Sequence, residues 1–248
     1  VNRGMKSLSL AIAKIIKAVS EGVLAMGLVF NPTAFNSNQL EVSLPRTVQV
    51  WSTAQVQSTQ TPTAQVPDSA RAKMSPLAQQ VYESMAPAAM RVGKGFIVAD
   101  KPMGMLHIFN ADGSVMAQDA ALYGKDKGDV ITGKSSLVGG AKITPAGKFT
   151  LKATRDAEYT GGVRLDLRET QVGGAVIAVH AAWLGDAKEN RTARLTSPSA
   201  SDNRVSYGCI NTTHATFLEK VLPNIDTFDG GLIFVLPEAG GDVAAMFP

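Results

Sequence analysis

Short apolar runs separated by turn sequences dominate the chain between Val92 and Glu238. The runs have the length of β-strands, and sequences such as Ala111-Asp112-Gly113 between them favour turns. There is no internal repeat and no regular alternation of strand and helix, so solenoid and doubly wound folds are disfavoured. We therefore predict a mainly β fold, a sandwich or barrel with a few helices. Its strands are predicted at Phe96–Ala99, Met105–Phe109, Lys148–Lys152, Val163–Leu167, Ala175–His180 and Leu232–Leu236, with a further strand after the turn at Ala111-Asp112-Gly113.

Two helices accompany these strands. Ser75 is a good N-cap and Pro76 fits the first helical position, which predicts a short packing helix that ends before Pro87. The second helix is predicted over Thr213–Val221 and ends at Pro223, since proline interrupts a helix.

The amino-terminal part is typical of an export signal followed by a linker. Arg3 and Lys6 precede an uncharged apolar run at Gly22–Phe30, which is too short to span a bilayer as a helix. Ser, Thr, Gln, Ala and Pro make up almost all of Ser52–Gln65, and this composition favours a flexible, disordered tether. An amphipathic helix at Lys6–Glu21 on a membrane surface is the alternative. We predict a signal segment at 1–37, a flexible linker at 38–68, a helical lead-in at 69–91 and a main domain at 92–248.

The composition excludes several classes of site. A formal net charge of +3 is too mild for the clustered basic surface of a nucleic-acid binder. One cysteine, Cys209, rules out an intramolecular disulfide framework, a cysteine-rich zinc site and an iron–sulfur cluster. Gly128–Ser135 matches the phosphate-loop pattern, but Pro145 follows where the required helix should run, so we predict no nucleotide binding. We expect neither a cofactor nor a bound metal.

The segment Ser206–Asn211 reads Ser-Tyr-Gly-Cys-Ile-Asn and is followed directly by the second predicted helix. A cysteine just before a helix N-terminus faces unpaired N–H groups and the positive end of the helix dipole, which favour thiolate over thiol. The sequence therefore predicts that Cys209 is activated by its position. Gly208 allows a tight turn whose amides could donate to an oxyanion. The alternative is a small buried residue that caps a helix.

A nucleophilic cysteine needs a base, and His180 is the best candidate because it ends an apolar strand that can hold it rigidly. His214 is expected to face solvent or pack locally, and His107 is expected to be structural. Any single histidine taken alone is more often structural than catalytic. Zinc binding by His180, Cys209 and His214 is a weaker alternative, because structural zinc takes four ligands at compact spacing.

A glycine-rich loop is also rich in lysine. Its side chains could steer an anionic substrate toward a cleft, although a solvated surface loop is the commoner explanation. The lysines are Lys125, Lys127, Lys134 and Lys142.

Taken together, these residues resemble a known family. Ser206–Asn211 resembles the Ser/Thr-His-Gly-Cys-hydrophobic-Asn/Arg signature of YkuD-type L,D-transpeptidases, the cysteine enzymes that remodel bacterial peptidoglycan. Val179-His180-Ala181-Ala182 resembles the strand with the family's catalytic histidine, and Thr144–Phe149 resembles its Thr-Pro-x-Gly-x-Phe stretch. Phe96–Asp100 with the strand that follows resembles its opening hairpin. The resemblance covers about Gly95–Glu238, in the same order.

The resemblance implies an L,D-transpeptidase-like sandwich or barrel that acts on peptidoglycan stem peptides, releases D-Ala and forms a cross-link through a cysteine acyl-enzyme. It implies that Cys209 is the nucleophile and His180 the base. We expect the Ala181 carbonyl, or another backbone carbonyl beside it, to hold the second ring nitrogen of His180. The resemblance further implies oxyanion or supporting roles for Ser206, Tyr207, Gly208 and Asn211, and substrate contacts for Ala181 and Arg204. An exported monomer in the periplasm or cell wall, without an integral membrane span in the mature chain, fits this function.

Two departures from the family pattern leave alternatives open. Tyr207 replaces the histidine of the signature and is not a base near neutral pH, but His180 matches the usual catalytic base, so we expect activity to survive. The gap of 29 positions between His180 and Cys209 is longer than usual, and the charged segment Asp186–Arg194 is either a lid or specificity loop or a surface excursion. The alternatives are an L,D-carboxypeptidase, in which water resolves the thioester, and a catalytically silent wall-binding module, which Tyr207 favours.

Overall fold

A computed structural model describes residues 66–131, 140–157, 162–170 and 176–247, all within one unit of the chain. The predicted signal segment at 1–37 and most of the predicted linker at 38–68 lie outside the described residues. Part of the phosphate-loop match at Gly128–Ser135 also lies outside them. Within the described ranges, no helix combines the length and the apolar character that crossing a bilayer requires.

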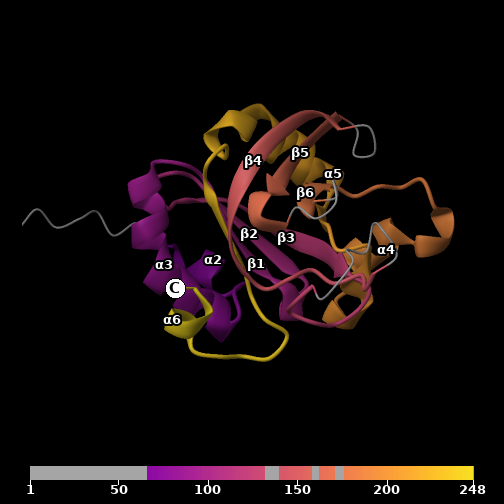
Figure 1. The fold of residues 1–248 in the computed structure, drawn as a ribbon, viewed down its shortest axis with the longest axis horizontal. Coiled ribbons are helices and arrows are strands. Elements are labelled where there is room, and N and C mark those ends of the chain that lie inside the picture. Colours follow the sequence, from indigo (N-terminus) through magenta and orange to yellow (C-terminus); the bar gives the residue numbers. More distant parts are fainter. Residues whose placement is uncertain (1–65, 132–139, 158–161, 171–175, 248) are drawn as a thin grey trace, which may run out of the picture. The chain divides into compact units, whose positions relative to one another are not determined.

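The strands form one sheet that closes on itself. In the described part of the chain nine strands pair in the order β2-β1-β9-β4-β5-β6-β8-β3-β7. Because β3 pairs with β8 and also with β2, eight of them close into a barrel and β7 adds to β3 outside the ring. Closure leaves few unpaired sheet edges. The mainly β prediction with a few helices is confirmed (Figure 1). The strands are β1 (Phe96–Asp100), β2 (Met105–Phe109), β3 (Val115–Gly124), β4 (Gly147–Ala157), β5 (Gly162–Leu167), β6 (Ala178–Ala181), β7 (Arg204–Ser206), β8 (Ile210–Thr212) and β9 (Leu232–Val235).

Most predicted strands are present, with shifted ends. β1, β2, β5 and β9 match their predictions to within one residue at each end. β4 continues past Lys152 to Ala157, because it pairs with β5 along that whole length. β6 begins at Ala178, later than predicted. Each of the unpredicted strands β7 and β8 has three residues, too short for an alternating pattern to show.

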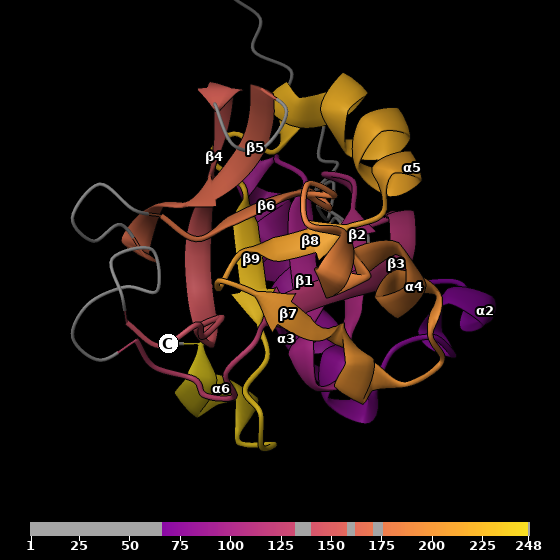
Figure 2. The same cartoon turned by 90° about the vertical axis from the view of Figure 1, so that its right-hand side faces the viewer.

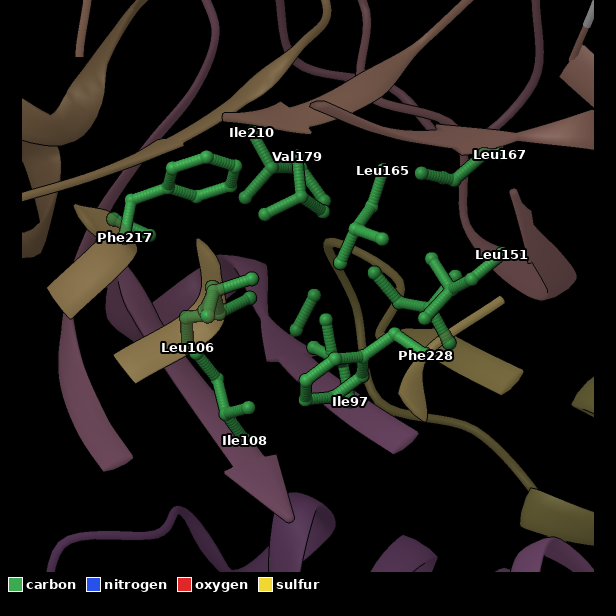
Figure 3. Close-up of a cluster of buried hydrophobic side chains, with 14 of the residues drawn as sticks. Ile97, Leu106, Ile108, Leu151, Leu165, Leu167, Val179, Ile210, Phe217 and Phe228 are labelled. Carbon is green, nitrogen blue, oxygen red and sulfur yellow. The ribbon is translucent and has the colours of Figure 1, made fainter. Parts of the chain in front are cut away.

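The main hydrophobic core fills the inside of the barrel. Alternation along each strand sends every second side chain inward, so strands distant in sequence meet there. Burying one such aliphatic or aromatic side chain contributes about 1.5–3 kcal/mol. Figure 3 shows the convergence of Ile97, Leu106, Ile108, Leu151, Leu165, Leu167, Val179, Ile210, Phe217 and Phe228, all buried.

A long helix, α3 (Pro76–Val92), covers a second core with the aromatic rings of β1 and β2. The predicted cap is confirmed, since Ser75 Oγ accepts a hydrogen bond from the Ala78 N–H at 3.1 Å. The predicted end before Pro87 is wrong, because the helix continues to Val92 and ends at Gly93, whose φ is +70°. Pro87 is exposed, so water can satisfy the carbonyl that its missing N–H leaves unpaired.

The helix after β8 has three parts. A turn of α-helix, α5 (His214–Thr216), leads into a π-helical turn at Phe217–Val221 and then a 3-10 helix at Leu222–Thr227. The predicted helical segment is therefore present, but Pro223 does not end it. Pro223 lies in the first turn of the 3-10 helix, where a backbone N–H has no intrahelical partner. The remaining helices are α2 (Asp68–Arg71), α4 (Arg191–Thr196), α6 (Val243–Met246) and 3-10 turns at Lys101–Met103, Arg168–Thr170, Ala187–Glu189 and Ala200–Asn203.

Candidate functional site

The parallel pair β6 and β8 positions the residues of the candidate site. The two strands lie side by side (Figure 2). In their register Val179 lies opposite Ile210, and His180 lies opposite Asn211. Val179 and Ile210 point into the barrel core, so the alternation of a strand directs His180 and Asn211 to the other face. Cys209 immediately precedes β8 and shares that face with Asn211.

Cys209 and His180 line the same cavity, whose volume is about 530 Å³. The cavity lies on the outer face of the barrel. All of its lining residues come from the second half of the sequence, between Arg164 and Asn211. It combines a thiol, an imidazole and two guanidinium groups with an exposed indole and an exposed phenol. Its other lining residues are Arg164, Val176, Ala178, Trp183, Arg191, Ser206, Tyr207 and Asn211.

Hydrogen bonds at both ring nitrogens fix the orientation of the His180 imidazole. Nδ1 lies 2.7 Å from the Ala181 carbonyl oxygen, the contact expected from the sequence. Nε2 lies 3.0 Å from Nδ2 of Asn211, which is a donor. Nδ1 therefore donates its proton to the carbonyl, and the Nε2 lone pair faces Asn211. The pKa of His180 is lowered to about 4, chiefly by burial and to a smaller extent by the charges of Arg191 and Arg164, against an opposing effect of the hydrogen bond to the Ala181 carbonyl.

A chain of polar contacts holds Asn211 in place. The Arg191 guanidinium is buried and donates from Nη1 to Asn211 Oδ1. Arg191 Nε donates to the Glu189 carboxylate at 2.7 Å. Because Oδ1 of Asn211 is bound to a cation, its amide nitrogen is turned toward His180. The charged segment Asp186–Arg194 thus contributes a buried side chain to the site and is more than a surface excursion.

The predicted activation of Cys209 by a helix dipole is wrong. A strand, β8, follows Cys209, and α5 begins only at His214, so no helix N-terminus faces the sulfur. Cys209 is partly buried, and this burial raises the pKa of its thiol. A hydrogen bond from the Ala178 backbone and the nearby cations Arg164 and Arg191 act in the opposite direction. The resting residue is a thiol that shares its cavity with a neutral imidazole.

The turn that carries Cys209 is held by side-chain hydroxyls. Ser206 Oγ donates to the Cys209 carbonyl at 2.6 Å and accepts from the Gly208 N–H at 3.1 Å. Gly208 has a φ of +119°, which favours glycine. Thr144 Oγ1 donates to the Gly208 carbonyl at 2.7 Å. Since the Gly208 N–H is already bound to Ser206, its predicted role as an oxyanion donor is not supported.

The other candidate residues lie outside the cavity or on its rim. Tyr207 is 46% exposed and lines it. Ala181 does not line it, and its carbonyl is engaged with the His180 ring. Arg204 lines a neighbouring cleft instead. His107 is buried in β2 with Nδ1 3.0 Å from Gln118 Nε2, while His214 is exposed. Over the described ranges no three His, Cys, Asp or Glu side chains come together in a group that could hold a metal ion.

Sequence reasoning missed Arg164, Trp183 and Arg191. Arg164 lies in the middle of β5 and Trp183 follows β6, so only the pairing of strands brings them to Cys209. Arg191 lies in the charged segment Asp186–Arg194, which the sequence left open as a lid or specificity loop or a surface excursion. The available local signal was a basic residue two positions after an acidic one, Glu189, to which Arg191 is bound in the structure.

Comparisons with known proteins give structural similarity at low identity. No family model matches the chain, and no curated protein matches it. The helical cell shape determining protein Pgp2 from Campylobacter jejuni is 15% identical over 60% of this chain and 50% of its own, with a TM-score of 0.40. An L,D-transpeptidase from Mycobacterium smegmatis is 18% identical over 57% and 58%, with a TM-score of 0.32. L,D-transpeptidase 3 from Mycobacterium tuberculosis is 15% identical over 57% and 60%, with a TM-score of 0.36.

The chain spans between half and three-fifths of the length of these solved structures. Because all three TM-scores lie below 0.5, we draw no conclusion about this chain from the similarity.

The depressed pKa of His180 makes the stability of the protein depend on pH. The folded-state pKa of about 4 lies below the ordinary value of 6.5, so the unfolded chain binds a proton that the folded chain excludes. Stability is therefore lost as the pH falls from 6.5 to 4, by about 3 kcal/mol for this group. We expect the free energy of unfolding, measured in urea at a series of pH values, to fall in this way for the wild type. Its slope against pH should be shallower for His180→Gln. The exposed His214→Gln is the matched control and should keep the wild-type slope, and equal slopes for wild type and His180→Gln would contradict the assignment.

Proposed function

We propose that this protein is a peptidoglycan L,D-transpeptidase that works through an acyl-enzyme on Cys209. The observation that carries the proposal is that Cys209 and a neutral, oriented His180 line one cavity, His180 from β6 and Cys209 from the residue just before the adjacent parallel strand β8. A thiol and a base within one cavity are the minimum for nucleophilic acyl transfer. The sequence resemblance around Ser206–Asn211 supports the choice of peptidoglycan stem peptides as substrate.

In the first half-reaction, the Cys209 sulfur attacks the carbonyl that follows the L-centre of the third-position diamino acid of a donor stem. The thiol proton passes to Nε2 of His180, which displaces the Asn211 amide from that nitrogen. The Nδ1–H of His180 continues to donate its hydrogen bond to the Ala181 carbonyl, which stabilises the imidazolium. When the carbon–nitrogen bond breaks, His180 returns its proton to the amine of the leaving D-Ala, and a thioester remains.

In the second half-reaction, the amine of an acceptor stem attacks the thioester. His180 takes a proton from this amine, the carbon–sulfur bond breaks, and His180 gives that proton to the departing Cys209 sulfur. The product is an amide cross-link between two stems, so atoms and charge balance over the cycle. The guanidinium groups of Arg164 and Arg191, which favour the thiolate of Cys209, also favour the negative charge of the tetrahedral intermediates.

The direct test incubates the protein with a tetrapeptide stem and follows the products by mass spectrometry. We expect an adduct on the intact protein equal to the donor without D-Ala, release of D-Ala and a cross-linked dimer. If the tripeptide forms and no cross-linked dimer appears, water resolves the thioester and the same site belongs to an L,D-carboxypeptidase. Absence of both adduct and D-Ala release would leave a silent wall-binding module and end the proposal.

This function requires access to the cell wall. We therefore include in the proposal that the chain is exported through its segment 1–37, acts in the periplasm or cell wall and works as a monomer. Fractionation of cells that express the full chain tests the location independently of activity.

A further inference from the structure

A second cavity, here called the basic cleft, lies beside the catalytic one and has a volume of about 260 Å³. Tyr207 lines both cavities. Among the described residues that line the basic cleft, Glu189 is the only acid. Its cationic lining residues are Lys125, Lys142, Lys188, Arg194 and Arg204.

Little of this positive charge is neutralised within the described part of the chain. The Glu189 carboxylate is bound to Arg191, which lines the catalytic cavity and not the cleft. Arg194 donates to the backbone carbonyls of Glu189 and Asp202, each at 2.7 Å, so no carboxylate offsets its charge. Arg204 is the exception, with a salt bridge of 2.6 Å to Glu238.

The three lysines of the basic cleft have no ion pair within the described ranges. Lys142 Nζ lies 3.7 Å from the centroid of the Tyr207 ring, so the residue shared by both cavities also carries a cation on its face. Cationic groups that converge in a cleft concentrate an anionic ligand there and can form charge-assisted hydrogen bonds with it.

Transfer between two peptides requires two binding regions that meet at one sulfur. The cavity around Cys209 is the place for the donor, because its carbonyl must reach the sulfur. The basic cleft shares the lining residue Tyr207, two positions before Cys209, with this cavity, which makes it the candidate for the second binding region.

We propose that the basic cleft is the acceptor subsite and binds a free carboxylate of the acceptor stem peptide through Lys142, Lys188 and Arg194. This inference rests on the proposed function, since it assigns the second substrate of the same reaction. It also gives the charged segment Asp186–Arg194 two tasks: Arg191 supports Asn211 in the catalytic cavity, while Lys188 and Arg194 face the acceptor.

The test measures acceptor binding directly, by calorimetry on the full chain at low salt. The probe is a synthetic tripeptide stem that ends in a diamino acid and carries free carboxylates, compared with the same peptide in which they are amidated. We expect the double variant Lys142→Gln/Lys188→Gln to bind the free peptide about tenfold more weakly than the wild type. Amidation should weaken binding to the wild type by a similar factor and remove the difference between wild type and variant. Lys73→Gln, an exposed lysine between α2 and α3 that lines neither cavity, is the matched control and should bind like the wild type.

The outcomes separate this inference from the proposed function. Equal affinities of wild type and double variant for the free peptide would overturn the acceptor subsite, even if D-Ala release is normal. A loss of donor acylation as large as the loss of peptide affinity would also overturn it, because the cleft would then serve the donor. Charge-dependent peptide binding without any acyl-enzyme would support the cleft while the proposed function fails.

Discussion

Replacing Cys209 by alanine should abolish both the acyl-enzyme and the release of D-Ala. The chain contains one cysteine, so no other thiol can take over the attack. Loss of a catalytic nucleophile lowers kcat by about 10⁵ to 10⁶-fold, with only binding and electrostatic effects left behind. The measurement is D-Ala release from a tetrapeptide stem, together with the mass of the intact protein after incubation.

The controls for this variant separate chemistry from folding. Ser206 and Thr144 hold the turn through backbone carbonyls and an N–H, so a methyl side chain at position 209 leaves these contacts in place. The thermal midpoint of Cys209→Ala should therefore stay close to that of the wild type. His180→Gln should also lose acylation, whereas the exposed His214→Gln should retain it. Turnover by Cys209→Ala at the wild-type rate would refute the mechanism.

Strands of five or more residues with an apolar pattern were predicted from the sequence, whereas the three-residue strands were not. β1 and β2 were predicted because each has five mostly apolar residues and a turn follows β2. β7 and β8 are three residues each, and their strand conformation comes from pairing with β3 and β6, which no local pattern shows. The start of the following helix was predicted to within one residue, at Thr213 against His214 in the structure. The extended strand β8 between Cys209 and this helix was not predicted, and this led to the wrong account of the electrostatics of Cys209.

The site itself depends on contacts between distant parts of the chain. The sequence motifs selected Cys209 and His180, and the structure places both on one cavity. The partner of His180 is Asn211, which the parallel register sets directly opposite it, and Asn211 is in turn held by Arg191. The charge of Arg191 gave no sign in the sequence that its side chain is buried. The burial depends on a hydrogen bond to Asn211, which lies 20 positions away along the chain.

This arrangement changes how the thiol is expected to react. With the pKa of the Cys209 thiol raised and the pKa of His180 lowered to about 4, the resting pair is neutral. Proton transfer must then accompany substrate attack, since no preformed thiolate exists. The neutral base remains available in mildly acidic solution, because His180 binds a proton only near pH 4.

The largest loss of stability is expected at a buried lysine, Lys101, which has no exposed side-chain surface. Its ammonium donates to the Gly128 carbonyl at 2.7 Å and to Asp129 and the Thr144 carbonyl at 2.8 Å each. Glu238 lies 3.3 Å away. Removing the ammonium leaves the Gly128 and Thr144 carbonyls without this donor and Asp129 without its cation. Each buried acceptor left unsatisfied costs about 1–3 kcal/mol, so the two carbonyls together cost about 4 kcal/mol.

We therefore expect Lys101→Met to lower the free energy of unfolding in urea by about 4 kcal/mol. The exposed Lys220→Met should change it by less than about 0.5 kcal/mol. The same ammonium holds the Thr144 carbonyl while the Thr144 hydroxyl holds Gly208, so the variant should also slow acylation of Cys209 at temperatures where it is folded. A loss of stability no larger than that of Lys220→Met would show that the Lys101 network does not anchor the catalytic turn.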